Sequence, residues 1–179
     1  MTESSPFITH PIHRRSTLHE MPRGRESTAY RFMRHGNEYI YKIINMERPG
    51  SFVHAPIEGT AVEQAAQMNK MYGILKRYYG DEIVNTLFFV AQETKSGAPK
   101  VACIQPFIKG TLGSELWTLR KVNGLDEKLN DWEKRWGEVL ADPEFQELSS
   151  STRDRYMMTD FHTFNCFRLG NGRYVFFDW

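Results

Sequence analysis

The sequence predicts an α+β fold, with a small antiparallel sheet and one helix first and a reduced helical part ending in a β-hairpin afterwards. Strand-like runs flank turn residues at both ends of the chain, and two stretches between them repeat apolar residues at helical spacing. The length of 179 residues and the apolar content of 40% suit one domain with a core, or two small lobes sharing a cleft.

The first elements form a hairpin. Residues 1–20 are rich in Ser, Thr, Pro and His without a sustained period, and we expect a flexible N-terminal arm. From Ser27 the text reads "STAYRFMRH", then Gly36-Asn37 as a turn, then "EYIYKIIN". This order of apolar runs around a turn is typical of a β-hairpin.

A helix and two further strands follow. Apolar residues recur at helical spacing from Glu58 to Tyr79, and Gly80 is expected to end that helix. The runs "NTLFFVAQE" and "KVACIQPFI" are joined by "TKSGAP", which predicts a second hairpin. The segment from Gly110 to Gly113 is expected to be a connector.

The last third is predicted to be two helices and a terminal hairpin. The helices run from about Asp126 to Leu140 and from Pro143 to about Arg155, with Asp142 as N-cap of the second. "CFRL", the turn "GNG" and "RYVFF" then form strands. Four apolar residues of this end are expected to be chiefly structural and to wedge the hairpin against the helices: Phe164, Phe167, Val175 and Phe177.

Composition narrows the classes of function. The net charge of +1 gives no reason to expect nucleic acid, and no apolar run is long enough to span a membrane. The N-terminus lacks the apolar region of a secretory signal peptide. Cys103 and Cys166 each lie in strand-like apolar text, which favours buried reduced thiols and a cytoplasmic protein.

The closing stretch "TDFHTFNCFRLGNGRYVFFDW" holds the polar residues that suggest chemistry. Asp160 and Asn165 are five residues apart, and Asp178 follows Asn165 after thirteen, with a complete hairpin between them. A hairpin returns its two ends to one place, so we expect the three side chains to meet. An amide and a carboxylate offer the hard oxygens that Mg²⁺ prefers, and a further carboxylate can accept a proton from a hydroxyl.

The residues "DFHTFN…FFDW" resemble the catalytic and metal-binding segment of the protein-kinase-like fold, and are most similar to its aminoglycoside and choline kinase branch. The resemblance implies that Asp160 is the catalytic base and that Asn165 and Asp178 bind magnesium. It also implies ATP and Mg²⁺ as cofactors and transfer of the γ-phosphoryl group to a hydroxyl.

Upstream text extends the resemblance to the phosphate-binding elements. "YIYKI" resembles the strand whose lysine pairs with the nucleotide phosphates, which gives Lys42. Glu63, with Glu58 as the alternative, stands where the family places the carboxylate that positions this lysine. "GRESTAYRF" resembles a phosphate-binding loop with a single glycine, and implies that Ser27 and Thr28 bind the cofactor.

"VACIQPFIKG" resembles the strand and hinge that hold adenine through backbone groups. The resemblance implies the Gln105 carbonyl and the Phe107 amide as the two contacts, with Ile104 as the gatekeeper. Residues 21–108 would then form a nucleotide-binding lobe, and residues 109–179 a truncated second lobe carrying the catalytic loop and the metal-binding hairpin.

The chain departs from full kinases because no activation segment and no further helices follow Asp178. It resembles the short kinase effectors that some bacteria inject into host cells, so action in a host cytosol is a further possibility. Three alternatives stay open for a kinase-like chain: a minimal active kinase, an inactive binding module (a pseudokinase), or a fragment such as part of a small-molecule phosphotransferase. A non-kinase α+β adaptor is a fourth alternative.

The acceptor is expected to be a protein, because antibiotic kinases build their acceptor pockets from the helices that are missing here. The α-carboxylate of Trp179 lies one residue from Asp178. It is expected to bind magnesium, to repel the nucleotide phosphates, or to lie in water without either role.

Overall fold

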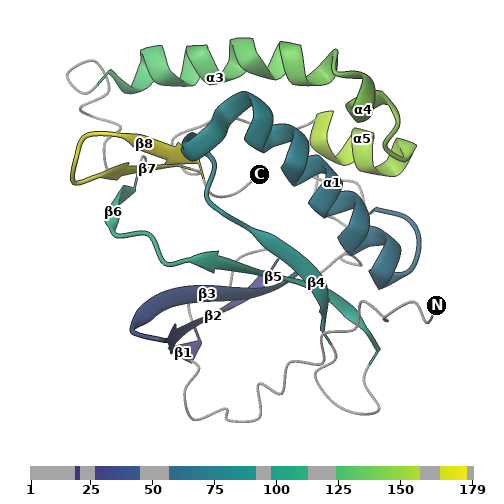
Figure 1. Ribbon diagram of the computed structural model, residues 1–179, viewed down its shortest axis with the longest axis horizontal. Coiled ribbons are helices and arrows are strands. Elements are labelled where there is room, and N and C mark those ends of the chain that lie inside the picture. Colours follow the sequence, from purple (N-terminus) through teal and green to yellow (C-terminus); the bar gives the residue numbers. More distant parts are fainter. Residues whose placement is uncertain are drawn as a thin grey trace. The chain divides into compact units, whose positions relative to one another are not determined.

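The structure, a computed structural model, combines antiparallel sheets with a few helices (Figure 1). It describes residues 19–20, 27–44, 57–91, 98–112, 124–157 and 166–176. The predicted α+β class is confirmed. The chain divides into two compact units, Met1–Lys70 with Thr86–Phe107 and Met71–Asn85 with Ile108–Trp179.

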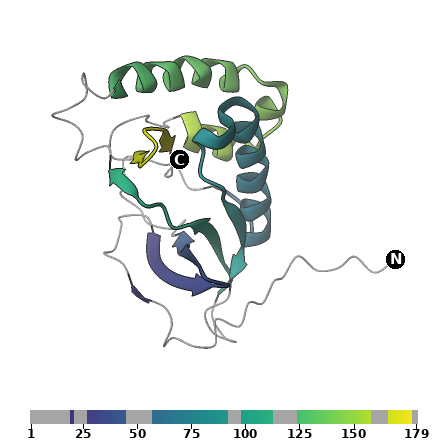
Figure 2. The same ribbon diagram turned by 60° about the vertical axis from the view of Figure 1, so that its left-hand side comes forward.

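The first unit contains a five-stranded antiparallel sheet in the order β1-β2-β3-β5-β4 (Figures 1 and 2). Its strands are β1 (His19–Glu20), β2 (Ser27–Arg34), β3 (Asn37–Ile44), β4 (Leu87–Ala91) and β5 (Lys100–Pro106). The β2–β3 hairpin and the antiparallel pairing of β4 with β5 confirm both hairpins predicted for this part of the chain.

The turn of the β2–β3 hairpin differs by one residue from the prediction. His35 and Gly36 form it, with φ values of 49° and 76°, whereas Gly36-Asn37 was expected. Asn37 instead pairs with Arg34 as the last rung of the ladder. A two-residue turn that matches the strand twist needs positive φ at both central residues, which glycine meets without strain and histidine tolerates.

Helix α1 spans Ala61–Tyr79 and starts three residues after Glu58. Gly80 ends it with φ of 53° and leads into the short helix η2 (Gly80–Glu82). The helix divides between the two units after Lys70. The predicted lobe of residues 21–108 therefore differs from the first unit, because residues 71–85 belong to the second.

The described part of the second unit also contains the helices α3 (Leu125–Leu140), α4 (Pro143–Gln146) and α5 (Ser150–Met157). Asp142 is the N-cap of α4, and its Oδ1 accepts a hydrogen bond of 2.8 Å from the Glu144 amide. The single helix predicted from Pro143 to Arg155 is two helices. The break lies at Ser149, whose Oγ accepts from the Thr152 amide and so starts a new helix.

A three-stranded sheet accompanies these helices, in the order β6-β7-β8. The strands are β6 (Gly110–Leu112), β7 (Cys166–Leu169) and β8 (Tyr174–Phe176). The terminal hairpin is confirmed, but the expected connector at Gly110 is a strand paired with β7. At Gly110 a Cβ atom would lie 2.6 Å from the Arg168 carbonyl oxygen, so only glycine fits this close approach.

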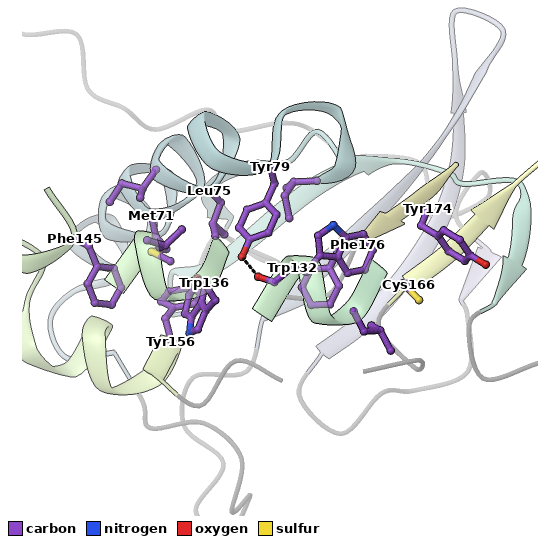
Figure 3. Close-up of a cluster of buried hydrophobic side chains, with 14 of the residues drawn as sticks. Met71, Leu75, Tyr79, Trp132, Trp136, Phe145, Tyr156, Cys166, Tyr174 and Phe176 are labelled. Atoms are coloured by element: carbon purple, nitrogen blue, oxygen red, sulfur yellow. Dashed lines mark hydrogen bonds between the residues drawn. The ribbon is translucent and has the colours of Figure 1, made fainter. Parts of the chain in front are cut away.

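Aromatic residues of α1, α3, α4, α5 and β8 lie at the centre of the core of the second unit (Figure 3). Trp132 of α3 is fully buried and meets the Phe176 ring edge-on at a centroid distance of 5.7 Å. The buried Tyr79 hydroxyl donates a hydrogen bond of 2.7 Å to the Trp132 carbonyl, drawn as a dashed line in Figure 3. Burial raises the pKa of Tyr79, and the hydrogen bond satisfies its hydroxyl.

The hairpin contacts this core through a different face from the predicted one. Phe176 belongs to the core cluster, and its strand partner Cys166 lies on the same face. Val175 is buried, as expected, but Phe167, its partner on the other face, stays partly exposed. Because "YVF" is apolar at every position, the sequence alone does not distinguish the two faces. Phe164 and Phe177 lie outside the described residues.

Both cysteines are buried thiols, as predicted. Burial raises the pKa of the Cys166 thiol to about 11, so this thiol is protonated at neutral pH. Among the residues that the structure describes, none of the helices has the length and apolar character needed to cross a bilayer.

Candidate functional site

Lys42 lies on β3, an interior strand of the five-stranded sheet. Its Cα partners are Ala29 on β2 and Cys103 on β5. Because side chains alternate along a strand, Lys42 shares a face with Ile40, Cys103 and Gln105. Lys42 is partly buried on this face. The sheet register therefore fixes which other side chains belong to any site built around this lysine.

Glu63 lies in the first turn of α1, where it forms a capping box with Thr60. Its Oε2 accepts hydrogen bonds from the Thr60 amide at 2.7 Å and from the Thr60 hydroxyl at 2.8 Å, while the Glu63 amide donates to Thr60 Oγ1. These bonds to Thr60 lower the pKa of the exposed Glu63 carboxyl. The structure thus gives Glu63 a role in starting the helix, and its pairing with Lys42 stays a prediction. Glu58, the alternative, is also exposed.

Ile104, the predicted gatekeeper, does not share the face of Lys42. Ile104 is the Cα partner of Tyr41 and packs with the cluster of Tyr41, Phe89 and Ala102, on the face opposite Lys42. Gln105, the partner of Ile40, is buried on the Lys42 face, where its Nε2 donates a hydrogen bond of 2.9 Å to Thr86 Oγ1. Gln105 is therefore the residue whose side chain lines this face.

The two backbone groups expected to hold adenine are directed at β3 instead. The Phe107 amide donates a hydrogen bond of 2.9 Å to the Glu38 carbonyl. In an antiparallel ladder, every second pair of opposite residues exchanges backbone hydrogen bonds. Ile40 and Gln105 form the pair two positions from Glu38 and Phe107, so the Gln105 carbonyl is also directed at β3. The prediction for the Phe107 amide is thus wrong in this structure. The register directs the intervening Pro106 carbonyl away from β3.

A cluster that the sequence analysis missed lies at the end of the same face. The Arg31 guanidinium binds the Glu38 carboxylate, with an Nε–Oε1 distance of 2.9 Å and a second contact from Nη2. The same guanidinium lies 4.2 Å above the centre of the Phe107 ring. The three residues come from β2, β3 and the segment after β5. A local signal was present in Arg31 and Glu38, a charged pair flanking the hairpin turn.

The residues predicted for catalysis and for metal binding, Asp160, Asn165 and Asp178, lie outside the described residues. The described hairpin between Asn165 and Asp178 has the predicted form, with Cys166 and Phe176 as Cα partners at its open end. Within the described part of the chain there is no group of three or more His, Cys, Asp or Glu residues placed to hold a metal.

Ser27 and Thr28, the remaining predicted cofactor-binding residues, are described by their backbone alone. They open β2 and pair with Ile44 and Ile43 on β3. Their strand positions therefore lie beside that of Lys42, whose partner is Ala29.

A second missed cluster, the Glu82 network, joins η2 to α3 in the second unit. Glu82 accepts hydrogen bonds from Lys128 Nζ at 2.5 Å, from Trp132 Nε1 at 2.6 Å and from Arg135 Nη2 at 2.5 Å. Burial opposes ionisation of Glu82, but these three donors outweigh it and lower the pKa of the carboxyl. Both carboxylate oxygens of Glu82 are thus bound by residues of α3, which indicates a structural role.

Neither a family model nor a curated protein matches this sequence. Among solved structures, the chain is similar to the crystal structure of a thermostable mutant of aminoglycoside phosphotransferase APH(4)-Ia in its apo form. That match has a TM-score of 0.37 and 14% identity over 64% of this chain and 33% of the other. A ternary complex of such a mutant with AMP-PNP and hygromycin B gives a TM-score of 0.38 and 16% identity over 65% and 34%. The chain matches about a third of the length of these phosphotransferase structures.

Proposed function

We propose that this chain binds MgATP and transfers its γ-phosphoryl group to a hydroxyl. The observation that carries the proposal is the β7–β8 hairpin. Its partners Cys166 and Phe176 end the described ladder side by side, and Asn165 and Asp178 are one and two residues beyond them along the chain. The topology thus supports a common place for an amide and a carboxylate that the sequence resemblance identifies as metal ligands.

The donor set suits magnesium. Asn165 and Asp178 supply hard oxygen ligands, and two protein ligands leave coordination positions for phosphate oxygens and water. Magnesium bound there would neutralise the charge of the phosphates. The sequence resemblance also assigns Lys42, on an interior strand of the first unit, to the nucleotide phosphates, and it assigns the start of β2 at Ser27 and Thr28 to the phosphate-binding loop.

Asp160 would orient the acceptor hydroxyl and take its proton. The acceptor oxygen then forms a bond to the γ-phosphorus, and the bond from that phosphorus to the β,γ-bridging oxygen breaks. ADP leaves with the electron pair of that bond. Positioning and charge stabilisation would supply most of the rate enhancement, because a phosphoryl transfer of this kind needs little covalent chemistry from the protein.

The base of the nucleotide would lie at the far end of the Lys42 face, at the end of β5. The Pro106 carbonyl, which the register directs away from β3, replaces the Gln105 carbonyl as the acceptor for the exocyclic amino group of adenine. A proline at this position has no amide of its own to satisfy. Gln105 would line the site with its side chain instead.

The acceptor class remains a prediction from the sequence, which favours a protein hydroxyl. An aminoglycoside is the second acceptor to assay, because a structurally similar phosphotransferase was solved with hygromycin B and AMP-PNP. A catalytically inactive nucleotide-binding module is the alternative function, and it differs from the first only in turnover.

Calorimetric titration of the chain with ATP, with and without Mg²⁺, tests the proposal. We expect Mg²⁺-dependent binding that Lys42→Ala and Asp178→Asn each weaken. Lys134→Ala is the matched control for the lysine, since Lys134 is exposed on α3 in the other unit. A wild-type chain that binds no MgATP would overturn the proposal.

Turnover is measured separately with γ-labelled ATP, using a generic protein and an aminoglycoside as acceptors. We expect labelled product from the wild type and none from Asp160→Asn, which should still bind MgATP. Binding without any transfer to either acceptor, and without ATP hydrolysis, would reject catalysis and support the inactive module.

A further inference from the structure

We infer that Arg31 provides a stacking platform for the nucleobase, held flat between Phe107 and the incoming ring. This inference rests on the proposed nucleotide site and adds a residue that determines affinity for the base. It concerns the first unit alone, because Arg31, Glu38, Lys42 and Phe107 all belong to that unit.

The Arg31 guanidinium is held in place by two neighbours. Its central carbon lies 4.2 Å over the centre of the Phe107 ring, and its Nε and Nη2 both contact the same Glu38 oxygen. The Arg31 side chain nevertheless keeps 41% of its surface exposed. A planar cation with one covered side and substantial remaining exposure can take a second aromatic ring on its open side.

The platform lies on the face that carries Lys42. Arg31 is the Cα partner of Ile40, and Glu38, Ile40 and Lys42 alternate along β3 on that face. Lys42 is four positions after Glu38, which is about 14 Å along the strand. This spacing is comparable to the length of an extended nucleoside triphosphate. If Lys42 contacts the phosphates, the base reaches the neighbourhood of Arg31.

The chemistry of the cluster favours a base over a phosphate. The Glu38 carboxylate cancels the charge of Arg31 at this end of the face, so a second anion gains little there. Stacking uses the flat surface of the guanidinium and is insensitive to which base is bound, since every base has a π-face. The edge of the base would meet the Pro106 carbonyl, which supplies the preference for adenine. Arg31 therefore contributes affinity, and Pro106 contributes selectivity.

The test compares MgATP with inorganic tripolyphosphate, which has the phosphates and lacks the base. Two variants remove the platform in different ways: Arg31→Lys loses the planar group, and Phe107→Leu loses the ring beneath it. Arg34→Lys is the matched control, because Arg34 is exposed on the same strand and alternates to the opposite face. Thermal unfolding of each variant confirms that it is folded.

We expect Arg31→Lys and Phe107→Leu each to weaken MgATP binding by about fivefold or more, the lower end of base stacking. Tripolyphosphate affinity should change less than twofold, and the ratio of ATP to GTP affinity should stay constant. Lys42→Ala should weaken the binding of both ligands.

If ATP binding depends on Lys42 but is unchanged in both platform variants, the inference about Arg31 is overturned and the proposed function is not. An equal loss of ATP and tripolyphosphate in these variants would also overturn the inference about Arg31, whereas a wild-type chain that binds neither ligand would overturn both proposals.

Discussion

Asn69 on α1 bonds both backbone groups of Phe88 on β4 with one side-chain amide. Its Nδ2 donates to the Phe88 carbonyl at 2.8 Å, and its Oδ1 accepts from the Phe88 amide at 3.0 Å. β4 is an outer strand of its sheet, so the Phe88 groups that face away from β5 need partners outside the ladder. The asparagine thus supplies, from a helix, the pair of bonds that another strand would supply.

Replacing Asn69 by alanine is expected to destabilise the first unit. The substitution removes two partly buried hydrogen bonds and leaves the Phe88 backbone to find water, so we expect a loss of about 2 kcal/mol in the free energy of unfolding. Urea unfolding followed by circular dichroism measures it. Asn69→Asp keeps the acceptor and loses the donor, and should fall between wild type and Asn69→Ala.

Asn130→Ala is the matched control for this experiment, because Asn130 is exposed on α3. Alanine is the better helix former, so that variant should be unchanged or slightly more stable. Equal stabilities of Asn69→Ala and wild type would show that the Phe88 groups are satisfied without Asn69.

Two glycine-to-alanine substitutions are expected to have opposite effects. At Gly110 the new Cβ would lie 2.6 Å from the Arg168 carbonyl oxygen, so the β6–β7 pair must move apart at a cost of about 1–3 kcal/mol. At Gly137 within α3 the Cβ would meet nothing within 4 Å, and alanine should stabilise the helix by about 0.5–1 kcal/mol. Midpoints of chemical unfolding compare the two variants. A Gly110→Ala chain as stable as wild type would contradict the close approach of β6 to β7.

Glu82→Gln tests the charge of the Glu82 network at constant shape. Glutamine keeps the side-chain length but removes the charge that Lys128 and Arg135 face. Because the Glu82 side chain is only a quarter exposed, we expect a loss of about 1–2 kcal/mol at pH 7. Lys134→Ala, an exposed change on the same helix, should leave stability nearly constant.

The pH dependence of this difference follows from the direction of the pKa shift. The folded pKa of Glu82 lies below its ordinary value of 4.5, so the unfolded chain takes up a proton first as the pH falls. The stability contributed by the charge is fully present above the ordinary value and is lost as the pH falls through the folded pKa. Unfolding of wild type and Glu82→Gln at pH 7 and at pH 3 should therefore show the gap narrowing in acid. A constant gap at both pH values would assign the loss to packing instead.

The parts of the fold that were predictable from the sequence are those with strong local signals. The apolar period of α3, the Asp142 cap and the alternating text of β2 and β3 each determine their element from neighbouring residues. The short strand β6 (Gly110–Leu112) has no local strand signal, because these three residues become a strand only when β7 pairs with them. That pairing joins Gly110 to Leu169, almost sixty residues later.

The candidate site was predictable to the level of the strand but not of the face. A one-residue shift of register exchanges the two faces of a strand. The apolar text of β5 therefore does not predict that Gln105, and not Ile104, shares the face of Lys42. The contact of Arg31 with Phe107 joins residues from separate segments, and no local sequence pattern predicts it. Lys42 was placed correctly on its strand because the "YIYKI" run is a strong strand signal.

Two substitutions of Glu63 separate its role in the capping box from its predicted pairing with Lys42. As part of the capping box, its carboxylate accepts from the Thr60 amide and hydroxyl, and a glutamine can accept the same bonds through its amide oxygen. As the partner of Lys42, it would need its negative charge.

Glu63→Gln should therefore preserve the cap and abolish any ion pair, whereas Glu63→Ala abolishes both. From the observed bonds we expect Glu63→Ala to lower the melting temperature and Glu63→Gln to restore it, with MgATP affinity unchanged in the glutamine variant. Wild-type stability together with weakened MgATP binding in Glu63→Gln would show that the charge acts on Lys42 in the nucleotide-bound state, and that the capping box describes only the unliganded chain.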